Sequence, residues 1–153
     1  MVGTIAMDVL LYARYRRGGG EDPFWSWESA AGVVDWETAS APGQLGQKAT
    51  RLVTRRQPSD DLARPMTNAV HWATGAAWAA QYAVLASRPT KHPLIRGLAL
   101  GPAVWLAGYA VLPLAGVYQA IWTYDARTLA DDLSAHVLYG VATSATVAAL
   151  NRP

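Results

Sequence analysis

Four ionisable side chains could do chemistry because they lie inside or beside long apolar stretches: Asp8, His71, Asp132 and His136. Asp132 and His136 are four residues apart, so they share one face if this stretch is helical. Carboxylate and imidazole groups can hydrogen-bond between helices, exchange protons near neutral pH or bind a divalent metal. All three interpretations stay open at the level of the sequence.

Motifs of well-known enzyme classes are missing from the sequence. It contains no HExxH, GxSxG, P-loop or GxGxxG pattern and no cysteine. The lack of cysteine excludes disulfides, thiolate metal sites and cysteine nucleophiles. We therefore expect no resident cofactor and no catalytic residue, and an enzyme is the third choice. The net charge of +2 is too small to indicate a nucleic-acid partner.

Three long segments, residues 65–87, 97–124 and 133–151, contain no Asp, Glu, Lys or Arg. Each is close to the ~20 residues that a helix needs to cross a bilayer core. A soluble helix of this length would show a charged face, which makes a soluble bundle the weaker alternative. An apolar N-terminal segment precedes them. We therefore expect an all-α membrane bundle of four helices, at about 2–15, 66–87, 94–122 and 128–150.

The first of these helices is too short to span a bilayer alone. We expect it to be the end of a spanning helix whose opening turns are missing, or else a short helix that thins the bilayer. The short connections 88–93 and 123–127 predict that neighbouring helices are antiparallel.

Most polar residues lie in the predicted first loop, residues 16–65. Its aromatic segment 23–27 suits a membrane–water interface. Residues 42–56 are predicted to form an amphipathic helix that lies on anionic lipid, or else packs as a solvated helix on the end of the bundle. The apolar face of this helix holds Leu45, Ala49, Leu52 and Val53, and its basic residues are Lys48, Arg51, Arg55 and Arg56.

The first loop with its flanks and the third loop lie on one side and together hold nine Lys and Arg residues, eight of them in the first, against four on the other side. The positive-inside rule places these loops in the cytoplasm and both ends of the chain outside. We therefore expect one multi-pass membrane domain, residues 1–153, whose first loop lies on the cytoplasmic side.

The antiparallel order also predicts a polar layer within the bundle. Asp8, His71 and His136 each lie within a few turns of a helix end, and these three ends are on the same side of the bundle. The three side chains should therefore lie at a similar depth in the membrane. The packing residues that we expect in and around this layer are His71, Gly75, His136, Tyr139 and Gly140. Small residues at four-residue spacing, such as Gly97 and Gly101, should let helices approach closely.

Several short motifs resemble the YagU-like group of small bacterial inner-membrane proteins and their actinobacterial relatives. They are Gly3-Thr4 with Met7-Asp8, the segment 41–46, His71-Trp72-Ala73-Thr74-Gly75, and His136-Val137-Leu138-Tyr139-Gly140. The resemblance covers most of the chain and implies several spans, with one histidine near the start of a helix and another in the last helix. Ala79 and Ala83 depart from the pattern, since relatives often have glycine there. The family carries no settled activity.

We therefore predict a non-catalytic integral membrane protein with a structural or pH-responsive histidine layer. Its expected partners are the lipid bilayer and either a second copy or another membrane protein. The alternative is a small proton- or divalent-metal-linked carrier, or a channel-like oligomer, that uses Asp8, His71 and His136, with Asp132 as a further candidate ligand.

Overall fold

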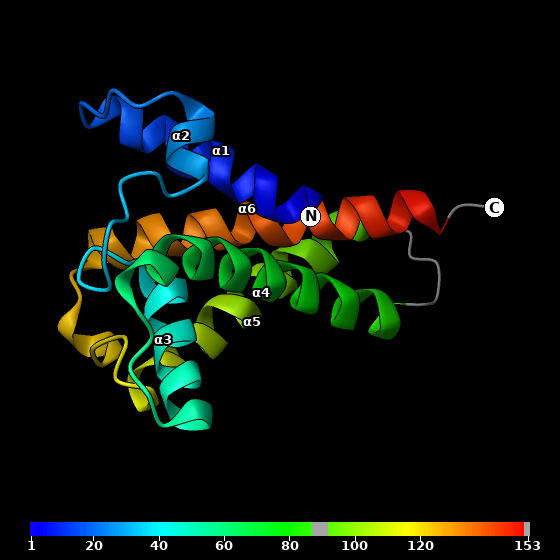
Figure 1. Cartoon of the computed structure of the whole chain (residues 1–153). Helices are drawn as coiled ribbons and strands as arrows, with labels where there is room; N and C mark the ends of the chain where they lie inside the picture. Colours follow the sequence, from blue (N-terminus) through cyan, green and yellow to red (C-terminus); the bar gives the residue numbers. More distant parts are fainter. Residues whose placement is uncertain (87–91, 152–153) are drawn as a thin grey trace.

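The computed structural model describes residues 1–86 and 92–151, and all regular secondary structure in them is helical (Figure 1). The predicted all-α fold class is therefore confirmed. Of the predicted segments, residue 87 and most of the connection 88–93 lie outside the described residues. The helices are α1 (Val2–Arg17), α2 (Phe24–Glu28), α3 (Ala41–Thr54), α4 (Ala63–Leu85), α5 (Pro93–Leu114) and α6 (Ala126–Leu150), with short 3-10 helices η1 (Asp60–Leu62) and η2 (Ile121–Thr123).

Helix α5 ends earlier than predicted, so the expected helix 94–122 was wrong at its C-terminal end. Gly116 has a left-handed conformation, with φ of +63°. Its N–H bonds to the carbonyl of Pro113, and the next N–H, from Val117, bonds to the carbonyl of Leu112. This pair of bonds is the Schellman motif that closes many helices, and glycine fits it because it has no Cβ.

Helix α6 is the centre of the bundle. It packs most extensively on α5 and next on α1, whereas α4 contacts α1 and α6 less closely and carries α3 on its other side. Both α1 and α5 run antiparallel to α6 (Figure 1). The N-terminus lies beside the middle of α6 in this view, so α1 covers only part of the length of α6 (Figure 1).

Three glycines bring the backbones of α5 and α6 into direct contact. A Cβ atom on Gly97 would lie 2.5 Å from the Cα of Val141, and one on Gly101 would overlap the carbonyl oxygen of His136. A Cβ on Gly140 would overlap backbone atoms of both Gly97 and Gly101. The predicted close approach at Gly97 and Gly101 is therefore confirmed, and Gly140 is its counterpart on α6.

The bundle buries small and polar side chains and leaves large apolar ones outside. Thr4, Asp8, Thr143 and Ser144 are each at most 3% exposed. The hydrophobic cluster around Trp36 lies in the first loop and at the start of α4. Large exposed apolar side chains on the long helices include Val2, Ile5, Val9, Val84, Leu85, Leu94, Ile95, Leu98, Leu106, Val111 and Leu114.

Among the described residues, α5 and α6 are the two helices long and apolar enough to cross a membrane. Helix α1 has 16 residues, and α4 carries the polar side chains Asn68, His71 and Gln81. Length and composition therefore single out two of the four predicted spans.

The glycine contact predicts a position-specific effect of added methyl groups in α5. Gly101→Ala forces the backbones of α5 and α6 apart and should lower the free energy of unfolding in detergent by about 1–3 kcal/mol. Gly108→Ala is the matched control, because a Cβ there meets nothing within 4 Å, and it should stay within about 1 kcal/mol of the native protein. Equal effects of the two substitutions would contradict a backbone contact at Gly101.

Candidate functional site

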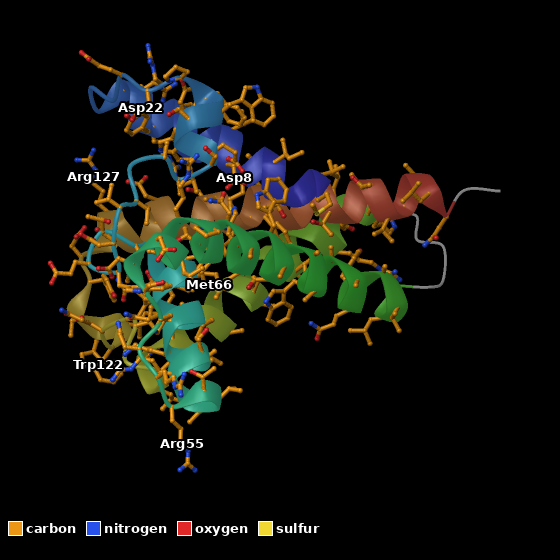
Figure 2. All side chains as sticks on the ribbon, viewed as in Figure 1. Asp8, Asp22, Arg55, Met66, Trp122 and Arg127 are labelled. Carbon is orange, nitrogen blue, oxygen red and sulfur yellow. The ribbon has the colours of Figure 1, made fainter. Side chains whose placement is uncertain are left out.

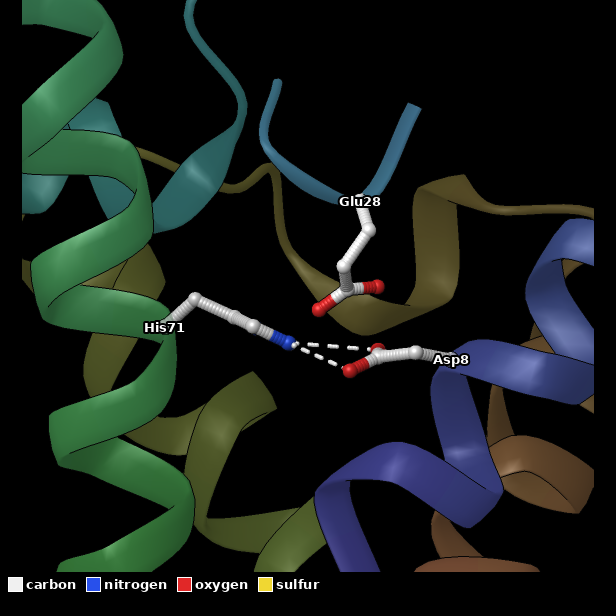
Figure 3. Close-up of side chains that lie close together, drawn as sticks. All are labelled: Asp8, Glu28 and His71. Carbon is white, nitrogen blue, oxygen red and sulfur yellow. Dashed lines mark hydrogen bonds and ion pairs between the residues drawn. The ribbon is translucent and has the colours of Figure 1, made fainter. Parts of the chain in front are cut away.

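Asp8 on α1 and His71 on α4 form a direct pair that joins the two helices. The Nε2 atom of His71 lies 3.0 Å from Oδ2 and 3.2 Å from Oδ1 of Asp8 (Figure 3). Asp8 is 2% exposed, whereas the side chain of His71 keeps 26% exposure. The structure thus brings together two of the three residues of the predicted polar layer.

The third member of this cluster is Glu28, the last residue of α2 (Figure 3). The potential ligand atoms of Asp8, Glu28 and His71 all lie within 4.8 Å of one another. Among the described residues, the Oε1 atom of Glu28 is buried and has no hydrogen-bond partner. Burial, and then the neighbouring Asp8 carboxylate, raises the pKa of Glu28 above its ordinary value. The site therefore favours the neutral, protonated form of the Glu28 carboxyl more than water does, unless a cation lies beside it.

Aromatic contacts hold α2 against α1. The rings of Phe24 and Trp27 lie 5.1 and 5.5 Å from that of Tyr12, and Trp27 lies 6.0 Å from Tyr15. Such ring pairs add packing energy beyond the area that they bury. They position the end of α2, and with it Glu28, above α1.

Helix α4 holds the chain directly after Glu28. The guanidinium of Arg64 donates to the carbonyl and the hydroxyl of Ser29, both at 2.9 Å, and Asn68 Nδ2 donates to the same carbonyl at 2.9 Å. Arg64, Asn68 and His71 share one face of α4 because they are spaced by four and three residues. One face of α4 therefore supplies both the imidazole and the contacts that fix the Glu28 backbone.

His136 has a different partner from the one that the predicted layer implies. Its Nδ1 atom lies 2.9 Å from the carbonyl oxygen and 3.3 Å from Oδ1 of Asp132, both on α6. The backbone of His136 lies on the side of α6 that contacts Gly101 of α5. The cluster around Asp8 therefore contains Glu28 where the sequence analysis placed His136.

The remaining predicted packing residues do join helices. The hydroxyl of Tyr139 donates to the carbonyl of Gly75 at 2.7 Å, which links α6 to α4. A Cβ on Gly75 would overlap the hydroxyl of Thr4, so α1 enters the same contact. Gly140 faces α5, as described above. Two of the predicted packing residues, Gly75 of α4 and Tyr139 of α6, thus contact each other, with α1 beside them.

Glu28 was missed because nothing in its sequence context marks it. It lies in the polar loop, outside the charge-free segments, and shares no helical spacing with Asp8 or His71. Aromatic residues directly precede it, but they indicate a membrane–water interface and do not single out Glu28.

The cluster combines two carboxyl groups and one imidazole. Groups of these kinds can exchange protons or bind a divalent metal. Asp132 and His136 form a separate carboxylate–imidazole pair.

Comparisons with known proteins give no assignment for this site. No protein-family model, no curated protein and no solved structure matches the chain. The resemblance to the YagU-like group therefore stays a prediction, and the function is argued from the geometry alone.

Proposed function

We propose that this chain is a non-catalytic, multi-pass integral membrane protein of the bacterial inner membrane. The observation that carries the proposal is the outward-facing apolar surface of α5 and α6. Only 17% of the most apolar 18-residue stretch of α5 is buried inside the protein, and only 28% of the corresponding stretch of α6. The core helix of a soluble protein would be mostly buried, so lipid is the solvent that accounts for this surface.

The proposal includes α1 and α4 as further membrane helices. Val2, Ile5 and Val9 on α1 are about half exposed, and Val84 and Leu85 on α4 are more than 70% exposed. At 1.5 Å per residue, the 23 residues of α4 extend about 34 Å, whereas the 16 of α1 extend about 24 Å. Helix α4 can therefore cross a bilayer core of ~30 Å, and α1 requires local thinning or further turns.

Helix α3 has the position and composition of a helix in the membrane plane. It runs across the direction of α4 and α6 at the end of the bundle where α2 and η2 also lie (Figure 1). The side chain of Arg55, just after its C-terminal end, points away from the rest of the protein, and Trp122 lies at the same end of the molecule (Figure 2). Two of its apolar residues, Leu52 and Val53, are more than 80% exposed. Its basic residues suit this face to anionic phospholipid.

The polar interior supports a packing role rather than catalysis. Three hydrogen-bonded pairs each join two different helices: Asp8 with His71, Tyr139 with Gly75, and Tyr82 with Ser144. Polar contacts of this kind hold membrane helices together where no hydrophobic drive exists between them. The histidine of the first pair therefore serves as a link between α1 and α4.

Labelling of introduced cysteines tests the membrane topology cleanly, because the chain has no cysteine of its own. We expect Ser59→Cys, in the first loop, to be protected from a membrane-impermeant maleimide in intact cells. Asn151→Cys, at the end of α6, should react. The protein should also resist carbonate extraction. Release by carbonate, or equal labelling of the two variants, would overturn the proposal.

The lipid contact of α3 has a spectroscopic test. An environment-sensitive fluorophore on Leu52→Cys should shift to the blue in nanodiscs that contain phosphatidylglycerol, relative to pure phosphatidylcholine. Neutralising Lys48, Arg51, Arg55 and Arg56 to Gln should remove this difference, because each basic residue near an anionic surface contributes about 1 kcal/mol. The same fluorophore on Glu37→Cys, an exposed loop position, is the control. A blue shift of equal size in nanodiscs with and without phosphatidylglycerol would contradict the assignment of α3 to anionic lipid.

A double-mutant cycle measures the link between α1 and α4. Asp8→Ala and His71→Ala should each lower the free energy of unfolding in detergent by about 1.5–3 kcal/mol, since each removes a hydrogen bond to a charged group. The double variant should lose clearly less free energy of unfolding than the sum of the losses in the two single variants. Glu37→Ala serves as an exposed control with no expected effect. Strict additivity would show that the pair does not hold the helices together.

A further inference from the structure

We propose that Asp8, Glu28 and His71 form a binding site for one divalent transition-metal ion. The inference goes beyond the proposed membrane function and does not depend on the number of spans. The three side chains come from α1, α2 and α4 and point toward one another (Figure 3). A metal bound there would connect the first loop to the bundle.

The distances between the donor atoms are close to those that a metal needs. Zinc and similar ions bind nitrogen and oxygen at roughly 2.0–2.2 Å, which sets neighbouring donors about 3–3.5 Å apart. His71 Nε2 already lies 3.0 and 3.2 Å from the two oxygens of Asp8. One donor atom from each of the three residues lies within 4.8 Å of the other two, so a small movement of the Glu28 side chain would bring the three donors to metal-binding separations.

The charge of the cluster favours a cation. Asp8 is buried and faces a second carboxylate, and buried like charges are costly unless a cation compensates them. Arg64, the nearest arginine on the same face of α4, donates to Ser29 instead. The buried Oε1 atom of Glu28 has no partner among the described residues. A divalent ion would neutralise both carboxylates and satisfy this oxygen.

The donor set also indicates the class of metal. Two carboxylates and one imidazole suit Zn²⁺, Mn²⁺ or Fe²⁺, whereas Cu⁺ prefers sulfur and Mg²⁺ and Ca²⁺ prefer oxygen alone. His71 and Glu28 are only half-buried, so water can fill the remaining coordination positions. This open arrangement differs from a closed structural zinc site with four protein ligands.

The chain supplies its own control in the pair Asp132 and His136. These residues also place a carboxylate beside an imidazole, with 3.3 Å between Nδ1 and Oδ1. They lack a third histidine or carboxylate donor: within the described residues, Asp8, Glu28 and His71 are the group of such side chains with metal-binding geometry. A pair of this kind binds divalent ions more weakly than three convergent donors.

Calorimetry on the full-length protein, without a histidine tag, tests the site directly. Chelator-treated protein in detergent is titrated with Zn²⁺ and, separately, with Mn²⁺. We expect one ion per chain for at least one of the two metals. Glu28→Gln and His71→Gln should each weaken binding at least tenfold, and Asp132→Asn and His136→Gln should leave the affinity within about twofold.

Glu28→Gln keeps the test independent of folding, because the residue lies outside the long helices. Helical circular dichroism and gel filtration show whether this variant folds like the native protein. No binding of either metal would overturn the proposal, and so would equal affinity in Glu28→Gln and the native protein. Loss of binding in His136→Gln as large as that in His71→Gln would place the ion elsewhere and would also overturn it. Cysteine labelling reports membrane insertion separately, so failure of the metal site and failure of the membrane proposal are distinguishable.

Discussion

The whole bundle depends on the backbone contact between α5 and α6. Gly97, Gly101 and Gly140 remove the side chains that would keep the two helices apart. Because this contact uses one side of α6, the side with Tyr139 and Thr143 remains for α1, where Gly3 of α1 meets both of them. Helix α6 thereby becomes the shared neighbour of α1 and α5, and the position of α1 sets the position of Asp8 and of its partner on α4.

Polar atoms take the place that a large apolar core occupies in most proteins. In the proposed membrane setting, helices that expose valine and leucine to lipid gain little from burying more of the same, because lipid is equally apolar. The pairing of helices then depends on specific polar contacts, such as that between Asp8 and His71. It also depends on small buried side chains such as Thr4 and Ser144. The cluster of Asp8, Glu28 and His71 likewise lies where three elements, α1, α2 and α4, meet.

The four long helices were predictable because apolar runs and small-residue spacing are local properties of the sequence, whereas the short helix α2 was not predicted. The end of α5 differs from the prediction because Gly116 closes the helix in a left-handed conformation that glycine favours. Glu28 was missed for a different reason: its place beside Asp8 depends on how α2 packs on Tyr12 and how Arg64 holds Ser29. The role of His136 followed from which side of α6 faces α5, and helical periodicity alone does not choose between sides.

The contact between α1 and α6 has a consequence for how the protein is made. Arg14 bonds to the carbonyl of Asp131 and the hydroxyl of Ser134, across 117 and 120 residues of chain. A ribosome that adds about 5–20 residues per second needs roughly 6–24 s to cover that distance. During this time α1 exists without its main packing neighbour. His71 is synthesised about halfway through the interval, so Asp8 can meet its imidazole partner well before the last helix emerges.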